Sequence, residues 1–132
     1  MRNTAFAMAV AVALGFGATS TQAAGSDGYG LDDYELGTAK DLYDVCTVPP
    51  GHADHAVAKA FCVGYFEGGI HLHDALAAAQ DFPRIACAPD NASRKELVEV
   101  FVAYAKANPQ YFSEAPMDVV FRAIVNKWPC DT

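Results

Sequence analysis

Residues 46–69 read CTVPPGHADHAVAKAFCVGYFEGG, and this stretch predicts two helices joined by a rigid turn. The Pro-Pro-Gly sequence at 49–51 stops any helix that precedes it. After the turn, apolar residues separated by alanines continue at helical spacing as far as Ala79. Cys46 ends the first helix and Cys62 lies about two turns into the second, so the turn would bring these two cysteines together.

The flanking sequence predicts two further helices and no strand. Thr38 with Asp41, and Ser93 with Glu96, have the spacing of a helix-capping box. No alternation of apolar and polar residues persists long enough to indicate a strand. The expected fold class is therefore all-α, a compact four-helix domain. The four helices are expected over 39–46, 53–79, 93–107 and 113–128.

Two glycines of the long second helix are expected to matter for packing. Gly64 and Gly68 are four residues apart, so they share one face of the helix. Small residues there would let another helix approach closely. Gly69 adjoins Gly68, and two adjacent glycines in a helix interior predict a kink.

The N-terminus predicts export. Arg2 precedes an apolar run from Ala5 to Phe16, and small residues follow, so 1–23 has the order of a signal peptide cleaved after Ala23. The run is too short to form a permanent membrane span. Cleavage would remove Arg2 and no acid, and the net charge would change from −7 to −8. The glycine- and aspartate-rich segment 24–37 is expected to be a flexible lead-in, and 38–132 the helical domain.

All four cysteines lie in the mature chain, at Cys46, Cys62, Cys87 and Cys130. An even number in a short exported protein predicts disulfides, which hold the domain together. The alternative, a zinc site, is disfavoured because the chain has no C-x-x-C pair. Three pairings are open. We favour Cys46–Cys62 and Cys87–Cys130, because the first closes the Pro-Pro-Gly turn and the second pins the C-terminus to the long loop.

Several function classes are disfavoured by the composition. The acidic surface would repel nucleic acid. With the cysteines oxidised no thiolate nucleophile remains, and Ser93 and Ser113 are better explained as helix caps, so we expect no enzyme activity. His71 and His73 are two residues apart and cannot share one helix face. Without cysteine ligands, these two and the pair His52 and His55 do not predict a metal site, and no cofactor is expected.

Three motifs, in this order and spacing, resemble a known family. Residues 62–68, CVGYFEG, are similar to its C-x-G-Y-x-x-G helix, and 87–89, CAP, with Ser93 are similar to its loop and cap. The terminal WPC at 128–130 completes the pattern. The family is the Rap/Tai group of type VI secretion immunity proteins, and the resemblance extends from about Leu42 to Cys130.

This resemblance implies an all-helical bacterial protein of the periplasm. It would bind an incoming peptidoglycan amidase and occlude the active site without catalysing a reaction, and a homodimer is also implied. The matched residues are disulfide and packing positions, so they indicate the fold rather than the partner. The loop at 49–52 and the stretch 71–74 depart from the family pattern.

The loops are the expected partner-binding surfaces, because the helices are occupied with the core. One candidate is the turn with Pro49, Pro50, Gly51 and His52, and the other is the loop 81–90, where we single out Asp81 and Arg84. Loops stiffened by proline lose little entropy on docking. Two other functions stay open at this point, a periplasmic acid-stress chaperone and a structural envelope protein.

Overall fold

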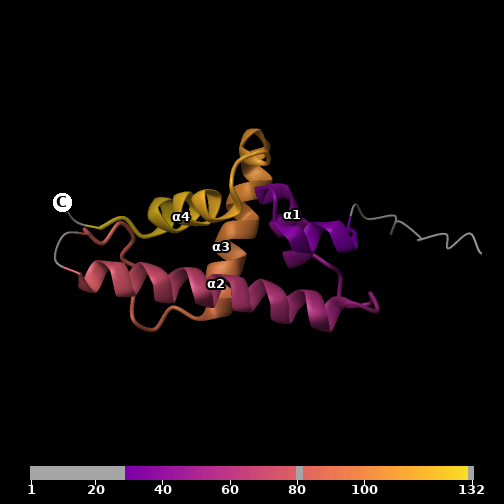
Figure 1. Ribbon diagram of the computed structural model, residues 1–132, viewed down its shortest axis with the longest axis horizontal. Coiled ribbons are helices and arrows are strands. Elements are labelled where there is room, and N and C mark those ends of the chain that lie inside the picture. Colours follow the sequence, from indigo (N-terminus) through magenta and orange to yellow (C-terminus); the bar gives the residue numbers. More distant parts are fainter. Residues whose placement is uncertain (1–28, 80–81, 131–132) are drawn as a thin grey trace, which may run out of the picture.

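The computed structural model describes residues 29–79 and 82–130, and these fold as four α-helices without a strand (Figure 1). The predicted all-α class is confirmed. Two short 3-10 helices, η1 and η2, accompany the α-helices. The elements in chain order are η1 (Leu31–Glu35), α1 (Ala39–Cys46), α2 (His55–Ala78), α3 (Arg94–Ala107), η2 (Pro109–Tyr111) and α4 (Pro116–Lys127).

The helices pack around α3. Figure 1 shows α2 running along one side of the molecule, with α4 and α1 following one another along the other side and α3 crossing behind them. Helix α3 contacts each of the other three α-helices, and α1 also contacts α2 and α4. Among the described residues, none packs against one side of the long helix α2.

The core lies where α2 and α3 cross. Phe66 of α2 and Phe101 of α3 are fully buried, and their rings meet edge to face with centroids 5.6 Å apart. Burying a side chain of this size contributes about 1.5–3 kcal/mol. Leu42 and Val45 of α1 and Val119 and Val120 of α4 complete this core.

The N-terminus of α1 binds the segment before α4. Thr38 and Asp41 form the predicted capping box. Beyond it, the N–H groups of Ala39 and Lys40, which have no partner inside the helix, donate to the carbonyl oxygens of Glu114 and Phe112 at 2.8 and 3.0 Å.

This contact explains where the last helix begins. Helix α4 starts at Pro116 and not, as predicted, at Ser113. The carbonyls of residues 112 and 114 bond to α1, and a proline fits the first position of a helix because its missing N–H would have had no partner there.

The segment expected to be a flexible lead-in has a defined structure in its described part, residues 29–37. Residues 31–35 form η1, which packs against α1. Tyr29 is buried, its hydroxyl donates to that of Tyr34, and Tyr34 packs edge to face on Phe61 of α2. Burial and this neighbour raise the pKa of Tyr29. The two tyrosines thus attach the segment to the helices. The many glycines and aspartates of the segment did not indicate this attachment.

Gly64 and Gly68 were expected to let another helix approach closely, and this prediction was wrong. Open space surrounds Gly64 and Gly68, where an added Cβ would meet no atom within 4 Å. The close approach is at Gly69, where an added Cβ would overlap the side chain of Met117 from α4. Helix α2 continues without interruption through Gly68 and Gly69.

Both favoured disulfides are confirmed. Cys46–Cys62 joins α1 to α2 across 16 residues, and Cys87–Cys130 joins the loop after α2 to the C-terminus across 43 residues. Beside the second bridge, the N–H of Cys87 donates to the carbonyl of Trp128 at 3.1 Å. The two bridges therefore fasten both ends of the domain to its centre.

Two expectations fall outside the described residues. These are the signal peptide at 1–23 and the docking residue Asp81. Within the described residues, no helix is long and apolar enough to cross a membrane.

Candidate functional site

The two predicted docking loops lie at opposite ends of α2. Pro49, Pro50 and Gly51 are exposed in the turn before this helix, and Arg84 is exposed in the loop after it. Because α2 has 24 residues and a helix rises 1.5 Å per residue, about 36 Å separates the two loops. They are two separate surfaces and not one site.

The turn before α2 is held by its own side chains. His52 Nδ1 accepts from the N–H of Asp54 at 3.1 Å, and its ring packs edge to face on Tyr29. His55 Nδ1 lies 2.7 Å from the carbonyl oxygen of Val48. Both histidines therefore help to hold the conformation of the turn, and its prolines and glycine are exposed to solvent.

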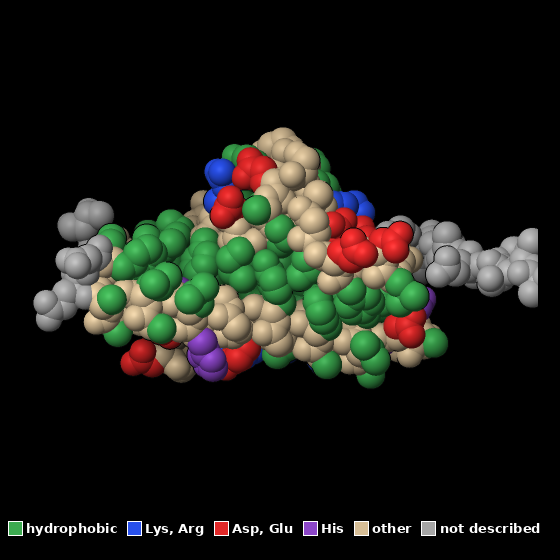
Figure 2. All heavy atoms as spheres, viewed as in Figure 1, with side chains coloured by type: hydrophobic (Ala, Val, Ile, Leu, Met, Phe, Trp, Pro, Cys, Tyr) green, Lys and Arg blue, Asp and Glu red, His purple; other side chains and the backbone are tan. Residues whose placement is uncertain are grey.

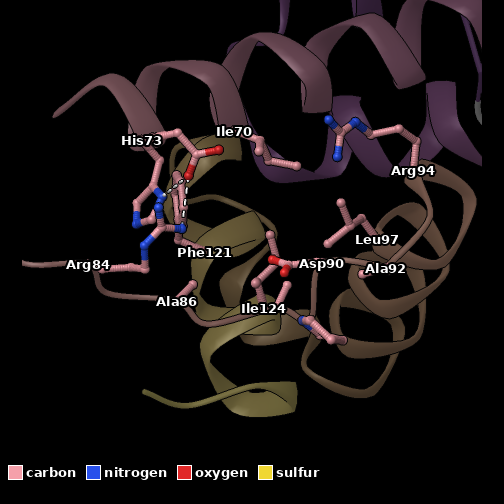
Figure 3. A pocket seen from close by; sticks show the side chains of 13 residues that line it. Ile70, His73, Arg84, Ala86, Asp90, Ala92, Arg94, Leu97, Phe121 and Ile124 are labelled. Carbon is pink, nitrogen blue, oxygen red and sulfur yellow. Dashed lines mark hydrogen bonds and ion pairs between the residues drawn. The ribbon is translucent and has the colours of Figure 1, made fainter. Parts of the chain in front are cut away.

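The loop after α2 covers a pocket of about 260 Å³, which lies between this loop, α2, α3 and α4. We call residues 82–92 the capping loop. Figure 3 shows its side chains facing the end of α2 across the pocket. The apolar floor consists of Ile70, Ala86, Leu97, Phe121 and Ile124.

Charged side chains border this pocket in pairs. Arg84 Nη1 of the capping loop donates to Asp74 Oδ1 of α2 at 3.0 Å. Arg94, at the start of α3, forms a two-pronged ion pair with Glu67 of α2. Asp90 lies between these pairs in Figure 3. The border is thus close to neutral, in contrast to the strongly acidic chain.

His73 is the only buried titratable side chain of the pocket lining. Its ring is 6% exposed and contacts Phe121 of α4, with centroids 5.3 Å apart. Nε2 accepts from the N–H of Ile85 at 3.3 Å, and Nδ1 lies 3.3 Å from Asp74 Oδ1. Both ring nitrogens are therefore engaged.

The lining of this pocket combines apolar side chains with a histidine, two aspartates and two arginines. It contains no serine, threonine, cysteine or lysine that could serve as a nucleophile. In the described part of the chain, no three His, Cys, Asp or Glu residues are grouped so that they could hold a metal ion.

The capping loop also exposes apolar side chains to solvent. Phe82 is 37% and Ile85 42% exposed, and they lie on either side of Arg84 in the sequence. Arginine and aromatic residues are enriched among the residues that dominate protein–protein affinity. Of the two predicted loops, this one has the chemistry of a protein-binding surface.

A comparison with known protein families identifies the group to which the chain belongs. A family model described as Rap1a immunity proteins matches residues 38–130. The chain belongs to this family. No curated protein and no solved structure matches it significantly. The chain is therefore an immunity protein, and the partner of such a protein is the effector against which it protects.

The Rap1a chain has a second apolar surface on α2. Figure 2 shows hydrophobic side chains in a continuous band over α2 and its neighbours, with acidic side chains at the borders of the band. We define the outer face of α2 as a set of its exposed apolar or small residues that recur every three or four positions along the helix. These are Val57, Ala60, Gly64, Gly68, Leu72 and Leu76.

Sequence reasoning singled out Arg84 but missed most of its surroundings. No sequence pattern pointed to Asp74, Glu67 or Arg94, because their pairing depends on how the capping loop folds back onto α2. The structure shows His73 hydrogen-bonded to the capping loop, a role that its position in the sequence did not indicate.

Proposed function

We propose that this immunity protein acts in the periplasm, where it binds and occludes a peptidoglycan amidase that a type VI secretion system delivers. The family match over the whole helical domain carries this proposal. The capping loop supports it, because a rigid loop with an exposed arginine between apolar residues can enter the cleft of an enzyme. Occlusion requires no catalytic group on the immunity protein.

Periplasmic residence has two independent supports. Residues 1–23 have the order of a signal peptide. The two disulfides form and persist in oxidising compartments such as the bacterial periplasm, and are rare in the cytosol.

The acid-stress chaperone alternative receives less support. Such a chaperone must open when its carboxylates become protonated. Asp44 is a buried carboxylate, and burial raises its pKa although Lys40 partly offsets this effect. A raised pKa in the folded state means that protonation relieves a cost of folding, so acidification at Asp44 favours the closed fold.

Contact killing between sister cells tests the proposed function. We expect a strain that lacks this protein to be killed by its parent on a solid surface, because the parent delivers the amidase. The full chain should restore survival, and a chain without residues 2–23 should not, since it would stay in the cytosol. Equal survival of the deletion strain beside the parent and beside a secretion-deficient parent would contradict the proposal.

We also propose that the protein forms a homodimer through the outer face of α2. In an antiparallel pair of α2 helices centred on Gly68, Leu72 of one copy lies opposite Gly64 of the other, and Leu76 lies opposite Ala60. Large side chains then face small ones across a two-fold axis, as a self-complementary interface requires. Leu72 and Leu76, one turn apart, are 61% and 42% exposed, and a second copy would cover both.

Changing Leu72→Glu should convert the dimer into a monomer, because each copy would bury a carboxylate in the interface, one helical turn from the proposed axis. Light scattering on the mature protein during gel filtration measures the mass directly. His71→Glu is the matched control, since His71 is the adjacent residue and its side chain is similarly exposed, at 68%. A monomeric mass for the unchanged protein at micromolar concentration would reject this interface.

A further inference from the structure

The capping loop is attached to α2 by a titratable side chain. The N–H of Ile85 donates to His73 Nε2, so Nε2 carries no proton. The proton of the neutral ring must therefore lie on Nδ1, which faces Asp74 Oδ1 at 3.3 Å. This hydrogen bond and the Arg84–Asp74 ion pair are polar contacts between the loop and the helix.

We propose that His73 is an acid-sensitive latch, which holds the capping loop on α2 while the imidazole is neutral and releases it when the ring is protonated. A protonated ring carries N–H groups on both nitrogens. Nε2 would then present a donor to the N–H of Ile85, and the hydrogen bond would be lost. A charged ring would also be confined between Phe121 and the loop, at 6% exposure.

The charges around the ring do not offset this loss. Asp74 attracts a charged imidazole, but the same Oδ1 already accepts from Arg84, whose positive charge opposes protonation. Asp74 is also about half exposed, so water screens the attraction.

The other elements packed around the ring add no further countercharge. Across the pocket, Asp90 of the loop makes no described contact with His73, and Arg94 of α3 is paired with Glu67. Helix α4 contributes Phe121 and Ile124 to the lining, and neither is charged.

The direction of the pH effect follows from proton binding. The released loop leaves His73 free to bind a proton, whereas the latched loop requires the neutral ring. The latched state is therefore favoured while the ring is neutral, and it loses stability as the pH falls and the ring takes up a proton. The Cys87–Cys130 disulfide would keep the released loop tethered to the C-terminus.

Amide hydrogen exchange at pH 7.5 and pH 5.5, followed by NMR on the mature protein, tests the latch. After correction for the intrinsic pH dependence of exchange, we expect the protection of the Ile85 amide to fall about tenfold at the lower pH. Amides around Phe101 in α3 should keep their protection, because the core contains no part of the latch.

Two variants separate His73 from other acid effects. In His73→Gln, the side-chain oxygen can still accept from Ile85 but does not titrate, so protection should become independent of pH. His71→Gln removes an exposed histidine on the same helix and should behave as the unchanged protein. Equal protection of Ile85 at both pH values in the unchanged protein, or an equal loss in His73→Gln, would overturn the proposal.

The consequence for a bound effector rests on the proposed function, whereas release of the loop does not. If the capping loop contacts the amidase, acid should weaken binding by the unchanged protein more than by His73→Gln. A loop that is released in acid while affinity stays constant would reject the loop as the contact surface and support the latch.

Discussion

Removing the Cys87–Cys130 disulfide is expected to lower the free energy of unfolding by about 4 kcal/mol. The bridge closes a loop of 43 residues, and it restricts the unfolded chain more than the Cys46–Cys62 bridge, which spans 16. The backbone bond from Cys87 to Trp128 would remain as a contact at this point, and one such bond contributes only about 1 kcal/mol.

Urea unfolding of the double variant Cys87→Ala and Cys130→Ala measures this loss. Substituting both residues avoids a free thiol, and alanine leaves no unpaired polar group. Helical circular dichroism in the absence of urea checks that the variant still folds. If the free energy of unfolding fell by less than about 1 kcal/mol, this would contradict the view that the bridge, and not packing, holds the C-terminus.

Truncating Arg84→Ala is expected to weaken inhibition of the amidase by about 10- to 100-fold, or about 1.4–2.7 kcal/mol. The side chain is 52% exposed while Asp74 holds it in place, so little entropy would be lost when it docks. Truncation would also leave the carboxylate of Asp74 facing the partner without its counterion.

The matched control is Arg122→Ala. Arg122 is 48% exposed, pairs with Glu114 and lies over the ring of Tyr111, away from the capping loop. Both variants lose one exposed ion pair, and Arg122→Ala also loses the contact with the Tyr111 ring, so the control loses at least as many contacts as Arg84→Ala. An equal effect of the two on inhibition would show that net charge, and not the capping loop, determines affinity.

The helices and disulfides were predictable because their signals are local. Thr38 with Asp41 and the Pro-Pro-Gly turn set both ends of α1, and Ser93 sets the start of α3. The preferred cysteine pairs followed from the short turn and the long loop between these helices. Apart from the Cys87–Cys130 pair, which spans 43 residues, each of these signals depends on residues close together in the sequence.

The remaining features depend on how distant segments meet. Gly64 and Gly68 share a face, but α2 is apolar around most of its circumference, so its pattern does not indicate which side faces the core. Tyr29 and Tyr34 lie in a segment whose composition is typical of a flexible leader. The role of His73 requires the capping loop to return to α2, and no local signal encodes that return.

Titration of the mature protein into a peptidoglycan amidase effector from the same bacterium tests the central claim most directly. Hydrolysis of purified cell walls, followed by the release of soluble fragments, reports the remaining enzyme activity. We expect activity to fall linearly to zero at one immunity chain per amidase. If every peptidoglycan amidase effector of that bacterium kept its full hydrolytic activity at a tenfold excess of the protein, the proposed occlusion would be contradicted.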